Sequence, residues 1–215
     1  MLRIVPIVEG HGEVPAVRIL LDRIWYEVVH GNALDILRPI RRPKSEFVRT
    51  QAGMPDPRVN EDKLARAGQL AANMLASKRS GGWRELILIL IDADEFCPAE
   101  VAPQICASIR NAVGEIDCVC ILAKKEYETW FVGAAESLQK FLNLGSEVAI
   151  PSAPEESGSG KNWIAERINR ASYSETVDQP SMTKKMNLNQ CRERCPSFDK
   201  LCRELERRGD STPGK

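Results

Sequence analysis

The chain has 215 residues with 30 basic and 30 acidic side chains, so its formal net charge is zero, and 43% of its residues are hydrophobic. This length and composition are typical of one soluble globular domain with a sizeable core. The balanced charge excludes a global basic field that would attract nucleic acid, although a local basic patch could still bind it. The longest unbroken apolar run, residues 86–91, is too short to span a bilayer, and no signal-peptide pattern precedes the first strand. We therefore expect a cytoplasmic protein that does not enter a membrane.

Strands and helices alternate over the first two thirds of the sequence. Residues 3–8 read as a strand, residues 13–29 carry apolar side chains at helical spacing, and residues 33–40 read as a second strand. This order favours parallel pairing through a crossover helix. The later pattern predicts helices over residues 61–78 and 99–113, strands over 85–92 and 117–123, and a helix that opens within 124–131. Because the strand over 85–92 is apolar on both faces, we expect an α/β fold with helices on both faces of a parallel sheet.

The alternation of strands and helices ends near residue 145. We therefore expect a core over residues 1–145 and a mainly helical C-terminal extension over residues 146–215 that packs on this core. Residues 151–160 are polar and rich in serine, proline and glycine, which is typical of a linker or an exposed loop. Residues 163–171 and 196–208 read as helices.

The seven cysteines read as buried side chains rather than as a disulfide framework, because their number is odd and no secretion signal is present. Cys118 and Cys120 lie in a predicted strand, and Cys106 lies on the apolar face of a predicted helix, so we expect all three to be buried. The cysteines at positions 191, 195 and 202 could share a helical face as zinc ligands do, but neither histidine is near them. Burial is the favoured interpretation here too.

Acidic side chains follow three of the predicted strands. They are Glu9 and Glu13 after the first strand, Asp92 and Asp94 at the end of the strand over 85–92, and Glu126 and Glu128 after the strand over 117–123. The carboxyl ends of parallel strands meet at one edge, where ligands bind. Crowded carboxylates repel one another at neutral pH unless a cation neutralises them or some of them hold a proton. The pattern thus predicts a site for a hard cation, Mg²⁺ or Mn²⁺, although each acid taken alone could simply cap a helix.

Two glycine motifs suggest nucleotide binding but fail in their details. Residues 10–15 follow a strand as a dinucleotide fingerprint does, but Pro15 takes the third glycine position and the neighbouring carboxylates would repel a pyrophosphate. Residues 155–162 resemble a phosphate-binding loop, but Glu155 replaces its first glycine and Asn162 replaces the residue that would hold magnesium. Neither motif therefore predicts a nucleotide site.

Residues 41–60 form a proline-containing segment with five basic side chains. One interpretation is a solvated loop, since charged runs usually face water. The other is a mobile basic flap that contacts phosphates beside the acidic edge. The candidate phosphate contacts are Arg41, Arg42 and Lys44 in this segment and Lys161 in the extension, where a solvated lysine is an equal alternative.

The acidic motifs carry a family resemblance. The sequence EGHGE at residues 9–13 and DAD at residues 92–94, each following an apolar strand, resembles the signature of the TOPRIM domain, a Rossmann-like fold found in topoisomerases, primases, recombination-repair proteins and OLD-family nucleases. The second acid, Glu13, resembles the form seen in OLD-type nucleases, which use two metal ions. Residues 125–131 and 194–198 also resemble a small stand-alone TOPRIM-like family of unknown function from prokaryotes, often found beside ATPases in genome-defence contexts. No ATPase and no topoisomerase tyrosine context is recognisable in the sequence.

The resemblance implies metal-dependent phosphoryl transfer. We expect a nuclease that cleaves DNA or RNA phosphodiesters, with DNA favoured, and an ATPase as a partner. Glu9, Asp92 and Asp94 would be the catalytic residues and hold the primary Mg²⁺ or Mn²⁺, and Glu9 could instead act as general base. The residues expected to complete a second metal position are Glu13, Glu126 and Glu128. Two alternatives stay open: a non-catalytic metal- or nucleotide-binding subunit of an ATPase complex, and a primase-like nucleotidyl transferase.

Overall fold

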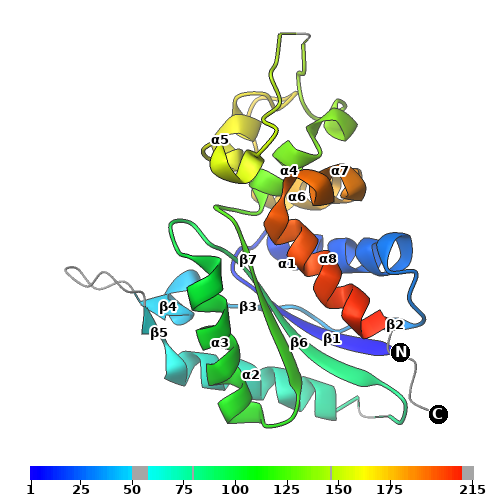
Figure 1. Ribbon diagram of the computed structural model, residues 1–215, viewed down its shortest axis with the longest axis vertical. Coiled ribbons are helices and arrows are strands. Elements are labelled where there is room, and N and C mark those ends of the chain that lie inside the picture. The colour runs from blue at the N-terminus through cyan, green and yellow to red at the C-terminus, as the bar shows by residue number, and fades with distance from the viewer. Residues whose placement is uncertain (50–57, 79, 146, 210–215) are drawn as a thin grey trace.

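A computed structural model describes residues 1–49, 58–78, 80–145 and 147–209 of the chain (Figure 1). In chain order the elements are β1 (Leu2–Val8), α1 (Glu13–Arg23), β2 (Leu34–Ile36), β3 (Ile40–Arg41), β4 (Val48–Arg49), β5 (Arg58–Val59), α2 (Glu61–Ala76), β6 (Arg84–Asp92), α3 (Pro98–Val113), β7 (Asp117–Ala123), α4 (Glu128–Gly133), α5 (Gly160–Ala165), α6 (Glu175–Thr183), α7 (Leu188–Arg194) and α8 (Pro196–Gly209). A π-helical turn, Ile24–Val28, follows α1, and short 3₁₀ turns lie at Lys44–Glu46, Ala135–Leu138 and Pro154–Glu156.

The main sheet is parallel and has the strand order β2-β1-β6-β7, with β3 pairing to β1 beyond the end of β2. Val8 of β1 lies opposite Leu90 of β6, and Leu90 lies opposite Ile121 of β7. The predicted parallel α/β sheet is therefore confirmed. Because the strands run in the same direction, the chain leaves β1, β6 and β7 at one edge of the sheet.

Helices cover both faces of the sheet, as the apolar sequence of its central strand predicts. Strand β6 alternates leucines on one face with isoleucines on the other, and both sets are buried. The leucines belong to a hydrophobic cluster with α1 and α8, and the isoleucines belong to a second cluster with α2 and α3. In Figure 1 these two pairs of helices lie on opposite sides of the strands, and α4 to α7 gather at one end of the molecule.

Strand β7 is the last strand of the sheet and is nevertheless buried. Its residues from Cys118 to Ala123 are all buried, with α3 on one side and α8 on the other. The guanidinium of Arg110 in α3 donates a hydrogen bond of 2.7 Å to the carbonyl of Cys118. Helices thus cover both faces of the last strand, and a side-chain donor occupies one carbonyl of its outer edge.

Two predicted elements in the first part of the chain differ in detail. The strand expected over 33–40 is split into β2 and β3, because Pro39 lies between them and has no N–H for the strand ladder. The helix expected to run to residue 29 changes to a π-helical turn at Ile24. Part of the predicted basic flap, residues 50–57, lies outside the described residues.

The predictions for the last third need larger corrections. Residues 151–160 form a largely exposed loop, as one of the two interpretations predicted, but they are not a free linker, because Glu155 is buried and its carboxylate accepts hydrogen bonds from the amide (2.9 Å) and hydroxyl (2.6 Å) of Ser197. The helix expected over 163–171 begins earlier, as α5, and ends at Ala165. Helices α6 and α7 were not predicted, since their short and polar sequences give little apolar periodicity.

All seven cysteines are free thiols, and only Cys97 is exposed. The expected burial of the other cysteines, including the three at positions 106, 118 and 120, is confirmed. In the described residues no helix is both long and apolar enough to cross a bilayer.

Candidate functional site

The carboxyl edge of the sheet positions the first pair of acids. Glu9 follows the last residue of β1 directly, and Asp92 is the last residue of β6. Since Val8 pairs with Leu90, Glu9 reaches the edge one residue before Asp92 does. The two acids meet because the chain leaves β1 at Glu9: the backbone amide of Asp92 interacts with the Glu9 carboxylate, and the charge of Glu9 acts on Asp92.

Glu13 reaches back from the first turn of α1 to the same edge. Its side chain is buried, with the residue only 4% exposed, and its Oε2 accepts a hydrogen bond of 3.0 Å from the amide of Glu9. Burial raises the pKa of Glu13 to about 7, and the charges of Glu9 and Glu128 add to the rise, although the amides of Glu9 and Gly10 oppose it. Glu13 can therefore hold a proton near neutral pH.

Burial and neighbouring acids also raise the pKa values of Asp92 and Glu9. Asp92 Oδ1 accepts a hydrogen bond of 2.8 Å from the amide of Tyr127, yet burial and the charges of Glu13, Glu128 and Glu9 raise the pKa of Asp92 well above its usual range. Burial also raises the pKa of Glu9, whose Oε2 is buried with no hydrogen-bond partner. The acids after β1, β6 and β7 thus form one group whose members repel one another, which is the arrangement that a bound cation would relieve.

Glu128 belongs to this group but is held by donors from the C-terminal extension. The residue is 3% exposed, and its Oε1 accepts hydrogen bonds from the hydroxyl of Tyr173 (2.8 Å) and the amide nitrogen of Gln179 (2.9 Å). Burial raises the pKa of Glu128, and both donors oppose the rise. The extension therefore forms part of the site.

Gly12 allows α6 to approach the β1–α1 loop. A Cβ atom at this position would lie 2.3 Å from Oε1 of Gln179 and 2.5 Å from the carbonyl oxygen of Glu175. The glycine is required for this close packing rather than for an unusual backbone angle, because its φ is −70°. The β1–α1 loop thus carries the acid Glu9 and also the glycine that lets α6 pack against the loop.

Asp94 and Glu126 do not join the buried group. Asp94 is exposed, has a left-handed backbone (φ 45°) and forms an ion pair with Lys44. Its amide donates to the carbonyl of Lys125, which is also left-handed (φ 62°), so two strained residues join the ends of β6 and β7. Glu126 Oε1 accepts hydrogen bonds from the hydroxyl of Ser159 (2.6 Å) and the amide of Lys161 (2.7 Å).

Of the candidate phosphate contacts, three lie at this edge. Arg41 donates to the carbonyl of Glu9 at 3.4 Å, Lys44 pairs with Asp94, and Lys161 pairs with Glu175. Arg42 pairs instead with Glu46, at 3.8 Å. The bases at the edge therefore already neutralise part of its negative charge.

The acids fit a hard cation by their chemistry, but they do not form a finished cage. Among the residues that the structure describes, no three His, Cys, Asp or Glu side chains are arranged to hold a metal ion. The protein donors just described occupy much of the ligating capacity, while Glu9 Oε2 is left without a partner. Mg²⁺ commonly uses one or two carboxylates and completes its shell with water and substrate phosphates. The set fits an open site of that kind.

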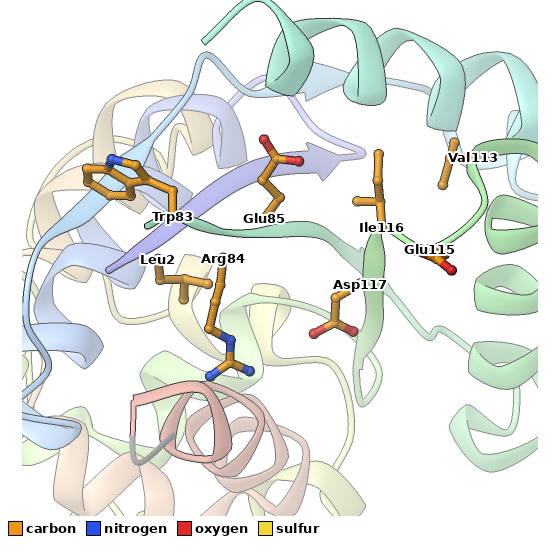
Figure 2. A pocket seen from close by; sticks show the side chains of 8 residues that line it. All are labelled: Leu2, Trp83, Arg84, Glu85, Val113, Glu115, Ile116 and Asp117. Atoms are coloured by element: carbon orange, nitrogen blue, oxygen red, sulfur yellow. The ribbon is translucent and has the colours of Figure 1, made fainter. Parts of the chain in front are cut away.

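A cavity of about 570 Å³ lies elsewhere, at the opposite edge of the sheet (Figure 2). Trp83, Arg84 and Glu85 line it from the start of β6, together with Asp117 from the start of β7. Arg208 of α8 pairs with Asp117 at 2.7 Å and accepts a hydrogen bond from Arg84 through its carbonyl. Because parallel sheets bind ligands at their carboxyl edge, the acidic edge is the stronger candidate.

Sequence reasoning missed the residues that the extension brings to the site, chiefly Tyr173 and Gln179. Both lie where the sequence shows no hydrophobic periodicity typical of a strand or a helix, so the sequence pattern could not place them. The sequence did contain one usable signal, Gly12, since a glycine before a helix often marks a close approach of two segments.

The family model described as a domain of unknown function (DUF4276) matches residues 8–206 of the chain. No curated protein and no solved structure matches this chain.

Proposed function

Since this chain belongs to the DUF4276 family, whose description states no function, we propose a function from the chain's own site. The proposed protein is a metal-dependent phosphoryl-transfer enzyme of the TOPRIM type, a nuclease that cleaves DNA or RNA. The observation that carries the proposal is the group of mutually repelling carboxylates at the ends of three adjacent parallel strands, of which Glu13 and Glu128 are buried and Glu9 and Asp92 are half-buried. A structural role alone would not require acids to be buried beside one another, because each raises the energy of ionising the next.

In this proposal Glu9 and Asp92 bind the first Mg²⁺ or Mn²⁺, with Asp94 joining them when its pair with Lys44 opens. Glu13 holds or releases a proton beside them, since its pKa lies near 7. The bound ions would supply charge stabilisation to the phosphate oxygens during an in-line displacement. Glu126 and Glu128 belong to a second position, which requires that they exchange their present hydrogen-bond donors for the cation.

The basic residues of the edge orient the phosphate backbone. Lys44 and Arg41 come from the segment after β2, and Lys161 comes from the start of α5. All three already contact acidic residues or the backbone carbonyl of Glu9, so a phosphate would compete for them at the acidic edge. Such phosphate contacts position a nucleic acid without reading its sequence.

The test is cleavage of plasmid DNA and of single-stranded RNA with Mg²⁺ or Mn²⁺, by the wild type and by Glu9→Gln. The substitution should lower the rate roughly 100-fold or more, as the loss of an active-site electrostatic group does. Glu61→Gln is the control, because Glu61 is an exposed glutamate at the start of α2, outside the buried group of acids. Cleavage that survives Glu9→Gln would come from a contaminant, and Mn²⁺ titration calorimetry without any heat of binding would refute the metal site.

The hydrogen bonds from Tyr173 and Gln179 favour a second candidate, a non-catalytic cation- or nucleotide-binding subunit of an ATPase complex. They occupy the carboxylate of Glu128 in the isolated chain. In that case Mn²⁺ would bind, but cleavage would appear only after an ATPase partner is added. A primase-like transferase would instead form product only from nucleoside triphosphates.

A further inference from the structure

A cluster of thiols lies beneath α3, away from the carboxylates. Cys118 and Cys120 are alternate residues of β7 and face the same layer, and Cys106 of α3 packs against them. All three line a groove of about 310 Å³ between α3 and α8, whose rim carries Arg110 and Lys200. The thiols are thus buried at the floor of the groove, and Cys106 is the most exposed of the three at 7%.

Two of these thiols, Cys106 and Cys118, line the groove together, one from the helix and one from the strand, and belong to one buried cluster. The Cys118 side chain lowers the pKa of Cys106, and the nearby Arg110 and Lys200 lower it further against the effect of burial. The Cys106 side chain and burial raise the pKa of Cys118. The pair is therefore asymmetric, with the thiolate favoured on Cys106 and the proton on Cys118.

A thiolate stabilised by cations and adjacent to a second thiol is the arrangement of redox-sensitive cysteines. We propose that Cys106 and Cys118 are a redox-active pair, in which a hydroperoxide oxidises Cys106 and Cys118 converts the product to a disulfide. The groove admits the peroxide, and Arg110, one helical turn after Cys106, lies on its rim. The proposal does not depend on the carboxylate site.

The two steps balance with the peroxide as the oxidant. The Cys106 thiolate attacks one peroxide oxygen, the O–O bond breaks, hydroxide leaves and the sulfur becomes a sulfenic acid. The Cys118 sulfur then attacks the sulfenic sulfur, the S–O bond breaks, and water leaves with the Cys118 proton. The thiolate and the thiol together lose two electrons, and hydrogen peroxide is reduced to one hydroxide and one water.

The experiment treats the reduced, folded full-length protein with hydrogen peroxide, alkylates the remaining thiols after denaturation, and digests the protein with trypsin. The peptide of residues 85–110 holds Cys97 and Cys106, and that of residues 111–124 holds Cys118 and Cys120. Mass spectrometry should detect these peptides joined, with the loss of two hydrogen atoms. The joined pair should vanish in Cys106→Ser and Cys118→Ser and persist in Cys97→Ser and Cys120→Ser.

A second measurement traps the intermediate. In Cys118→Ser the sulfenic acid has no partner thiol at that position, so a dimedone label should appear on Cys106. The wild type should lose most of this label. The proposal is overturned if peroxide modifies the exposed Cys97 while Cys106 and Cys118 stay reduced, or if the joined peptides survive Cys118→Ser. The wild-type digest can overturn the proposal without any variant, so a substitution that prevents folding leaves the test intact.

Discussion

Replacing Glu13 with glutamine should stabilise the protein above neutral pH and leave its stability almost unchanged near pH 4. Glu13 is buried among other acids and has a pKa of about 7, compared with an ordinary value of 4.5. Between these values the folded protein keeps a proton that the unfolded chain releases, so stability falls as pH rises through this window. Glutamine is neutral at every pH and can still accept the hydrogen bond from the amide of Glu9.

The size of the effect follows from the two pKa values. At about 1.36 kcal/mol for each pKa unit, raising the pKa of Glu13 from 4.5 to about 7 corresponds to about 3 kcal/mol of lost stability above pH 7. For a chain of this length each kcal/mol changes the melting temperature by roughly 2–4 °C, so Glu13→Gln should melt roughly 6–12 °C higher than the wild type at pH 8.

Melting curves of both proteins between pH 4 and pH 8, followed by circular dichroism, measure this difference. The matched control is Glu61→Gln, which replaces the exposed first residue of α2 and should show no comparable pH-dependent gain. A bound divalent cation favours the ionised form, so Mn²⁺ should stabilise the wild type more at pH 8 than at pH 5.5. If Glu13→Gln differs from the wild type by the same amount at every pH, or is the less stable protein at pH 8, the reasoning about the buried acids is wrong.

Two further substitutions test how the extension covers the site, each by urea unfolding. Tyr173→Phe removes a donor to the buried carboxylate of Glu128 and should lower the free energy of unfolding by about 2 kcal/mol, as the loss of a hydrogen bond to a charged group does. The control, Tyr26→Phe on the surface, should change the stability hardly at all. Equal losses in the two variants would contradict the contact. Gly12→Ala places a Cβ within 2.5 Å of α6 and should destabilise the folded protein by roughly 1–3 kcal/mol. In the control, Gly81→Ala, the added Cβ has no atom within 4 Å. A Gly12→Ala protein as stable as the wild type would show that α6 does not pack there.

The sequence predicted the sheet well because its signals are local and redundant. The strand over 85–92 is apolar at every position from Leu86 to Ile91, which only a strand buried on both faces explains economically. The last third was predicted poorly for the opposite reason. Glu155 reads as a loop residue, but its burial depends on Ser197, which is distant in sequence and leaves no local trace.

The candidate site shows the same division. The order of strands and acids indicated that carboxylates would follow β1, β6 and β7, and the structure shows the acids after those strands. Which of them lie together could not be read from spacing, because that depends on partners from elsewhere in the chain. Lys44 forms an ion pair with Asp94 and Ser159 donates a hydrogen bond to Glu126, whereas the charges of Glu13 and Glu128 act directly on Asp92.

The burial of β7 between two helices also bears on how the protein avoids aggregation. A bare last strand can template the addition of a strand from another molecule, and the sequence CVCIL of β7 has the apolar and β-branched character that such stacking favours. Helices α3 and α8 shield this strand, and α8 is the last helix of the described chain to be made. During synthesis the sheet can form before α8 exists, so the nascent chain passes through a stage in which β7 is open to intermolecular pairing, and docking of α8 ends that exposure.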